Sequence, residues 1–144
     1  MSKKILVVDD DFSQRDLYFE LFRDSGFDVT AANDGQDAWE KIQKDQPDLV
    51  FTGILMPRMT GFELIEKLRN NHATQSLPVI IFSHLGRNED RLRARTLSNV
   101  DFKIKGYDGP NSILKTVKNL LSTPSFAKPA VTASEDDRPG VPMI

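Results

Sequence analysis

The sequence predicts one α/β domain built on a doubly wound, five-stranded parallel sheet with the strand order 2-1-3-4-5. Strand-like and helix-like segments alternate five times along residues 1–121. Three of the strand-like segments are solid apolar runs, which is typical of parallel strands covered on both faces. The other two alternate apolar and polar residues, so they belong at the sheet edges, and 2-1-3-4-5 is the order that puts the second and fifth strands there.

The five predicted strands are short and rich in β-branched, aromatic and other apolar residues. They are residues 5–8, 27–31, 49–51, 79–82 and 100–104. In this strand order the chain reverses direction between the first and third strands, and ligands bind at such a switch point, beyond the carboxyl ends of the strands. The order therefore locates the functional site before any motif is considered.

Five amphipathic segments between the strands have the apolar spacing of helices. They are centred on residues 17–22, 38–42, 60–68, 88–97 and 111–121. Gly26 is placed to end the first helix, and Pro47 stops the second. Thr60 and Glu63 form a capping box that begins the third. The fourth is weakly apolar and rich in arginine.

The composition excludes several classes of protein. The chain has 144 residues, a formal net charge of -2 and no cysteine. Without cysteine there is no disulfide framework, thiolate zinc site or cysteine nucleophile. No global positive field attracts nucleic acid or an anionic membrane. The apolar run at residues 5–8 is too short for a signal peptide or a membrane span. We expect a cytoplasmic protein, either a monomer or a weak homodimer.

The last part of the chain differs in composition from the rest. Residues 122–144 contain four of the eight prolines and show no hydrophobic periodicity. Such a segment buries too little apolar surface to offset its ordering entropy. We expect a folded domain over residues 1–121 and a flexible tail over residues 122–144.

Polar residues gather where the predicted strands end. The first strand is followed by three acids, Asp9–Asp11. They suit a hard cation such as Mg²⁺, although a helix cap with two solvated acids is the alternative. Ser83 ends the fourth strand and Lys105 follows the fifth, so both side chains are candidates for the same cleft. We interpret His84 as a loop histidine, because no metal-type spacing of carboxylates accompanies it.

Five motifs together resemble the receiver domain of two-component response regulators, which has a flavodoxin-like fold. They are KILVVDDD (4–11), PDLV (47–50), MPRMTGFEL (56–64), LPVIIFS (77–83) and DFKIK (101–105). The resemblance covers about residues 3–121. It implies a signalling module in a phosphorelay rather than an enzyme.

The chain departs from this family at the phospho-acceptor. In the family an aspartate four residues before the proline of the Met-Pro dipeptide receives the phosphoryl group; here that position is Gly53. Phosphoryl transfer needs a carboxylate nucleophile, and glycine has no side chain. Asp48 is no substitute, because it opens the third strand at the opposite end of the sheet. We therefore expect no catalytic residue and no phosphorylation by the family mechanism.

The resemblance assigns roles to three residues that are retained. Ser83 matches the hydroxyl that bonds the phosphoryl group, and Lys105 matches the lysine that neutralises it. Phe102 matches the aromatic switch residue. With the acceptor gone, we expect Lys105 to pair with a neighbouring aspartate, Asp9 or Asp10, in a pre-set conformation.

The resemblance also assigns a metal site. Its remaining ligands are Asp9, Asp10 and the backbone carbonyl of Leu55. One charged oxygen fewer weakens Mg²⁺ binding, so we expect a weak site at most and no required cofactor.

Two loop positions differ from the family pattern. Gly106 stands where the family commonly has a proline with a cis bond, and we expect it to form that turn less rigidly. Thr60 replaces a common aspartate but still suits a helix N-cap.

The resemblance places the partner surface on the fourth helix, fifth strand and fifth helix, where a signalling protein would bind; a sensor kinase is a further partner it implies. On this chain the surface carries Arg87, Arg91, Arg93, Arg95 and Phe102. The alternative interpretation is a solvated helix whose arginines pair locally with Glu89 and Asp90.

Two other functions are open at this stage. The chain is a phospho-accepting receiver if Gly53 replaces an aspartate through engineering. A third class is another doubly wound protein, a Mg²⁺-dependent phosphatase or a flavin carrier. It is disfavoured because the third and fourth strands end without further acids, and the three acids after the first strand repel a flavin phosphate.

Overall fold

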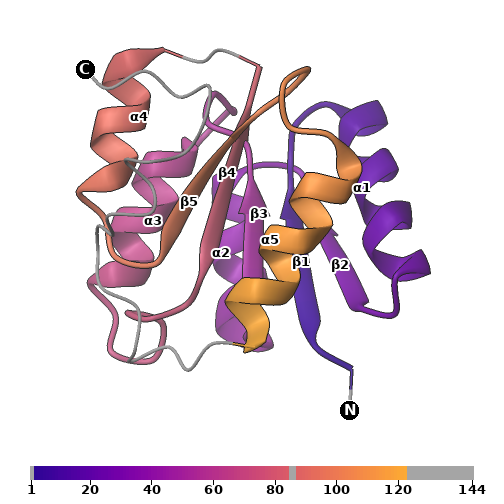
Figure 1. The fold of residues 1–144 in the computed structure, drawn as a ribbon. Helices are drawn as coiled ribbons and strands as arrows, with labels where there is room; N and C mark the ends of the chain where they lie inside the picture. Colours follow the sequence, from indigo (N-terminus) through magenta and orange to yellow (C-terminus); the bar gives the residue numbers. More distant parts are fainter. Residues whose placement is uncertain (1, 85–86, 123–144) are drawn as a thin grey trace.

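A five-stranded parallel sheet lies between two layers of helices (Figure 1). The structure, a computed structural model, describes residues 2–84 and 87–122. The strands are β1 (Lys4–Val8), β2 (Asp28–Ala32), β3 (Leu49–Thr52), β4 (Val79–Ser83) and β5 (Val100–Ile104). The helices are α1 (Phe12–Asp24), α2 (Gly35–Lys44), α3 (Gly61–Arg69), α4 (Asn88–Arg95) and α5 (Pro110–Ser122).

The strand order is β2-β1-β3-β4-β5, which confirms the predicted order and its edge strands. β3 and β4 are buried at every position, whereas β2 alternates between exposed and half-buried residues before its buried last residue. Val8 pairs with Thr52, and Ser83 pairs with Ile104. This register brings the carboxyl ends of the four strands to one edge of the sheet, where the switch point lies.

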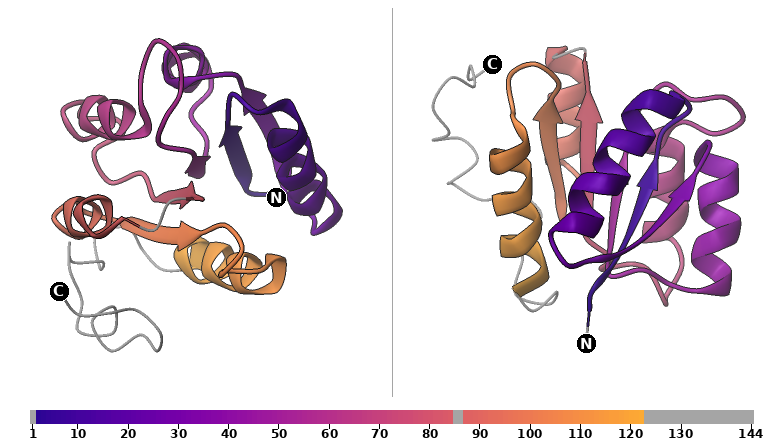
Figure 2. Two further views of the ribbon diagram at one scale, coloured as in Figure 1. Left: turned by 90° about the horizontal axis from the view of Figure 1, so that it is seen from above. Right: turned by 90° about the vertical axis from the view of Figure 1, so that its right-hand side faces the viewer.

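Each face of the sheet has its own core. On one face, α1 and α5 pack against β1, β3 and β4, and an aromatic cluster from α1, β3 and β4 lies within this core. Tyr18, Phe22, Phe51 and Phe82 form that cluster, with ring centroids 4.9–6.1 Å apart. On the other face, α2, α3 and α4 bury mainly aliphatic residues. Figure 2 shows the helices on the two sides of the sheet.

Helix ends follow the sequence signals. The Thr60 hydroxyl accepts from the Glu63 amide at 3.2 Å, and the Glu63 carboxylate accepts from the Thr60 amide at 2.8 Å, so the predicted capping box is present. Gly26 has φ +99° just after α1, a conformation that favours glycine. α4 ends at Arg95 rather than at residue 97, because the chain there tightens into a turn in which the Leu97 amide donates to Ala94.

Two expectations concern the end of the chain and membranes. α5 includes Ser122, one residue beyond the expected end of the domain, and the rest of the expected tail lies outside the described residues. Within residues 2–84 and 87–122, no helix has the length and apolar character needed to cross a membrane.

Candidate functional site

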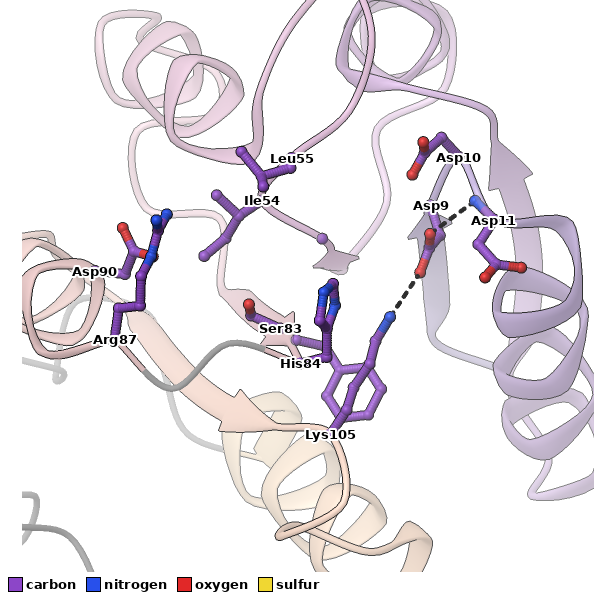
Figure 3. Close-up of a pocket in the computed structure, with 12 residues that line it drawn as sticks. Asp9, Asp10, Asp11, Ile54, Leu55, Ser83, His84, Arg87, Asp90 and Lys105 are labelled. Carbon is purple, nitrogen blue, oxygen red and sulfur yellow. Dashed lines mark hydrogen bonds and ion pairs between the residues drawn. The ribbon is translucent and has the colours of Figure 1, made fainter.

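A cavity of about 280 Å³ opens at the carboxyl edge of the sheet (Figure 3). The ends of β1 and β3 contribute Asp9, Asp10, Asp11, Gly53, Ile54 and Leu55. The end of β4, the start of α4 and the end of β5 contribute Phe82, Ser83, His84, Arg87, Asp90 and Lys105. Residues distant in sequence therefore meet at the switch point, as the strand order predicts.

Lys105 and Asp9 form an ion pair across this cavity. The Lys105 ammonium lies 3.6 Å from Asp9 Oδ2, and the two side chains are only 20% and 14% exposed. The other oxygen, Asp9 Oδ1, accepts from the Asp11 amide at 2.9 Å. Burial raises the pKa of Asp9 above its ordinary value, and the Asp11 amide and Lys105 oppose this shift. The expected pairing is present, with Asp9 rather than Asp10 as the partner.

The other two acids of the triplet differ in their surroundings. Asp11 is the N-cap of α1, where its side chain accepts from the amides of Ser13 (2.9 Å) and Gln14 (3.3 Å). Asp10 is exposed and lines the cavity. One of the three acids is thus structural, as the alternative interpretation of the triplet held.

Gly53 lines the cavity, and a side chain would fit there. A Cβ at this position would meet Met56 Sδ and Phe82 O at 4.0 Å, an ordinary van der Waals distance. Asp48 lies at the opposite end of the sheet, as expected, and its carboxylate accepts from the Lys4 amide at 2.7 Å. The end of β3 therefore brings no carboxylate to the cavity.

Ser83 and Phe102 occupy different environments. Ser83 is 7% exposed and lines the cavity. Phe102 is half-buried and packs against the core formed with α2, α3 and α4. The next residue, Lys103, is buried and lies 4.0 Å from Asp108. The cavity thus receives the serine directly, whereas the aromatic residue lies on the face covered by α2, α3 and α4.

The structure adds three residues to the cavity that the sequence did not place there. His84 lies in the loop after β4, as expected, and its exposed side chain points into the cavity (Figure 3). Arg87 and Asp90 form the far wall and pair at 3.2 Å. Their positions in the sequence could have indicated this. His84 directly follows Ser83 at the carboxyl edge of the sheet, and Asp90 lies one helical turn from Arg87.

The loop between β3 and α3 is held at several points. Arg58 has φ +68°, and its guanidinium donates to both carboxylate oxygens of Asp34 at 2.9 and 3.0 Å. Asp34 also caps α2 by accepting from the Asp37 amide at 2.9 Å. A Cβ on Gly61 would lie 2.1 Å from the Gly53 carbonyl oxygen, so α3 approaches this loop as only glycine permits.

Gly106 forms a left-handed turn after Lys105, with φ +85°. A proline has φ near −65° and cannot adopt this conformation. The prediction that Gly106 forms the turn of the family in a less rigid form is therefore wrong. The chain forms a different turn, with a backbone conformation that favours glycine.

The arginines in and just before α4 differ in their surroundings. Arg93 contacts α3, with its guanidinium 3.1 Å from the Glu66 carboxylate and 4.3 Å from the Phe62 ring centroid. Its side chain remains 51% exposed, and its place on the partner surface stays a prediction. Arg87 pairs with Asp90 and lies 3.8 Å from Glu89, as the local-pairing alternative held. Arg91 and Arg95 are half-buried.

The carboxylates of the cavity are few and partly engaged. Within the part of the chain that the structure describes, no three His, Asp or Glu side chains are grouped so as to hold a metal. Both oxygens of Asp9 already have partners, Lys105 and the Asp11 amide. Asp10 supplies one further carboxylate to the cavity, and the Leu55 backbone can supply an uncharged carbonyl oxygen.

The fold and the cavity at its switch point are those of a receiver-type α/β domain. Residues 5–118 match the response regulator receiver domain family, and the chain belongs to that family. Members of this family are regulators in two-component signalling.

Comparison with individual proteins supports the same assignment. The chain is 32% identical over 122 residues to the probable transcriptional regulator ycf29 of Pyropia yezoensis, covering 85% of this chain and 54% of that protein. It is 28% identical to chemotaxis protein CheY4 of Vibrio cholerae, with a TM-score of 0.77, covering 83% of this chain and 99% of that one. It is 25% identical to response regulator TrrA of Thermotoga maritima, which was solved in complex with Mg²⁺–BeF. That comparison has a TM-score of 0.72 and covers 82% of this chain and 98% of TrrA. The chain spans about half the length of the curated relatives it matches.

Proposed function

We propose that this chain is a receiver domain without the family's aspartyl phosphorylation, which signals by binding a protein partner. The observation that carries the proposal is Gly53, which lines the cavity where the family's acceptor side chain would project. A phosphoryl group needs a nucleophile in line with its leaving group, and β3 supplies none.

The Lys105–Asp9 pair supports a pre-set state. In the family the matching lysine neutralises the phosphoryl group, together with the serine that Ser83 matches. Here its ammonium is 3.6 Å from Asp9 and 5.4 Å from the Phe82 ring centroid, in a largely buried position. A cation held in this way needs no phosphoryl group to fix its position.

The proposal includes Mg²⁺ only as a weakly bound ion that the function does not require. Asp9, Asp10 and the Leu55 carbonyl are the proposed ligands. Because the Asp9 oxygens are already engaged, an ion would have to compete with the Lys105 ammonium.

The proposed partner surface comprises α4, β5 and α5, with Arg87, Arg91, Arg95 and Phe102. A signalling protein is the proposed partner, and a sensor kinase is the second partner class. Support comes from the edge position of β5 and from the exposed or half-buried state of these four residues. We further propose a cytoplasmic location and a folded domain that ends near residue 121.

The test is intact-mass spectrometry after incubation with Mg²⁺ and acetyl phosphate. We expect no phosphoryl adduct on the unaltered chain. Gly53→Asp should gain one adduct, because position 53 has room for a side chain, and Gly53→Ala is the matched control that should gain none. An adduct on the unaltered chain that maps to the cavity would overturn the proposal.

The open space at position 53 also favours the second candidate, a phospho-accepting receiver whose aspartate was replaced through engineering. That candidate predicts that Gly53→Asp restores both phosphorylation and a phosphorylation-dependent change in partner binding. Restored phosphorylation with no change in partner binding would count against it.

A further inference from the structure

The end of β5 carries two lysines in different surroundings. Lys105 follows the strand and forms the ion pair with Asp9 at the cavity (Figure 3). Lys103 lies within the strand and is buried. Val100 and Phe102 of β5 belong to the core formed with α2, α3 and α4. Because side chains alternate along a strand, Lys103 lies on the other face, which α1 and α5 cover.

The partner of this buried lysine is Asp108, in the turn before α5. Asp108 Oδ1 lies 4.0 Å from the Lys103 ammonium, and the two side chains are only 12% and 7% exposed. In the part of the chain that the structure describes, Lys103 has no other ionic partner. Separating a buried pair leaves each charge uncompensated, so the Asp108 side chain is held inward rather than in solvent.

The same carboxylate closes the turn after β5. Asp108 Oδ2 accepts from the Ile104 amide at 2.8 Å. The Ile104 carbonyl in turn accepts from the amides of Tyr107 at 3.1 Å and Asp108 at 2.8 Å. Asp108 Oδ1 also accepts from the hydroxyl of Ser112, in the first turn of α5, at 3.5 Å. One side chain therefore connects the last residue of β5 to the start of α5.

Lys105 lies inside this closed turn. The preceding residue, Ile104, is bonded to Asp108, and the following residue, Gly106, has φ +85°. The Lys105 amide itself donates to the Ser83 carbonyl at 2.8 Å. The backbone on both sides of Lys105 is therefore fixed, which sets where its side chain starts. Lysine has a flexible four-carbon side chain, so an ion pair forms at a lower entropic cost when the backbone already directs it toward its partner.

We propose that Asp108 is a positioning residue that directs Lys105 toward Asp9. Asp108 acts through the backbone of the turn, and its pair with Lys103 keeps it in place. This inference deepens the proposed function and rests on it, because the Lys105–Asp9 pair is the pre-set state proposed there. Without Asp108 the sheet remains, but Lys105 loses its fixed direction.

A double-mutant cycle with Lys105→Met and Asp9→Asn measures how strongly these two residues are coupled. The coupling is expressed as a ratio of unfolding equilibrium constants from urea denaturation at low salt. We expect a ratio of about ten in the otherwise unaltered chain, and a ratio below about two when the cycle is repeated with Asp108→Ala. A merely structural role of Asp108 would lower the stability of every protein in the cycle alike and leave the ratio unchanged.

Two further versions of the cycle provide the controls. K103M/D108A removes both charges, so it leaves no unpaired charge in the core and keeps the test possible if Asp108→Ala alone does not fold. The coupling should be lost there as well. Thr74→Val is the matched control, because Thr74 is buried in the loop before β4, at the other edge of the sheet, where its hydroxyl donates to the Leu68 carbonyl at 2.7 Å. It should destabilise the chain and leave the ratio at about ten.

Two results would overturn the inference. One is a ratio that stays at about ten without Asp108. The other is a ratio near one in the unaltered chain, because there would then be no pair to position. Neither result changes the proposed lack of aspartyl phosphorylation, which the phosphoryl mass of the chain decides. Conversely, a phosphoryl adduct at the cavity would overturn that proposal and leave the measured coupling as it is.

Discussion

The Lys105 ammonium lies 3.6 Å from Asp9 Oδ2, in a cavity that Gly53 also lines. The pair joins the ends of β1 and β5, which are separated in the sheet by β3 and β4. The ion pair therefore links the two outer sides of the cavity.

Lys105→Met should lower the free energy of unfolding by about 1–3 kcal/mol at neutral pH, because it leaves the largely buried Asp9 carboxylate without its cation. Urea denaturation measures the loss. The double variant with Asp9→Asn should recover part of it, because no unpaired charge is left. If the single variant were as stable as the parent, the ion pair would not support the pre-set state.

Asp34→Asn should destabilise the chain at neutral pH and make its stability less sensitive to acid. The hydrogen bonds from Arg58 hold the pKa of Asp34 below its ordinary value of 3.8. A carboxyl group whose pKa is lower in the folded state contributes stability above its unfolded pKa, and this contribution disappears as the pH falls through the folded pKa. The difference between the urea midpoints of parent and variant should therefore shrink as the pH falls below 3.8. A difference in urea midpoint that stays constant over this pH range would show that the charge of Asp34 does not stabilise the fold.

Gly61→Ala should destabilise the fold by about 1–3 kcal/mol, because a Cβ would lie 2.1 Å from the Gly53 carbonyl oxygen and force backbone apart. Thermal unfolding followed by circular dichroism measures the change. Gly53→Ala is the matched control on the other side of this contact; its Cβ has 4.0 Å to the nearest atoms and should be tolerated. Equal effects of the two changes would contradict the close approach of α3.

Gly106→Ala should lower the free energy of unfolding by about 1 kcal/mol, because Gly106 has φ +85° and the Cβ of an L-residue is sterically unfavourable there. Gly109→Ala, in the same loop, is the control: its Cβ would meet nothing within 4 Å and its φ is not in the left-handed range. Chemical denaturation should separate the two variants. A neutral Gly106→Ala would show that this turn tolerates a side chain.

Much of the fold could be predicted from local patterns. β5 was predicted to the residue, and the other strands to within one residue at each end. Solid apolar runs mark central parallel strands because both faces are covered, and the Thr60–Glu63 box marks a helix start because it satisfies backbone groups locally. These signals depend on neighbours in sequence, so the sequence alone carries them.

The directions of long side chains could not be predicted in this way. Arg93 belongs to the same arginine-rich helix as Arg91, yet it contacts Glu66 and Phe62 on α3. The pairing of Arg58 with Asp34, 24 positions away, is likewise absent from any local pattern. Such contacts depend on how helices approach one another, which short sequence windows do not contain.

The sequence by itself determined the α/β class, the strand order, the edge at which the site lies and the lack of a carboxylate at position 53. Only the tertiary structure decided that Asp9 rather than Asp10 pairs with Lys105, that His84 points into the cavity and that Gly106 forms a left-handed turn. The physical reason is range: periodicity and capping act over a few residues, whereas the cavity forms from strand ends that the fold brings together across the sheet.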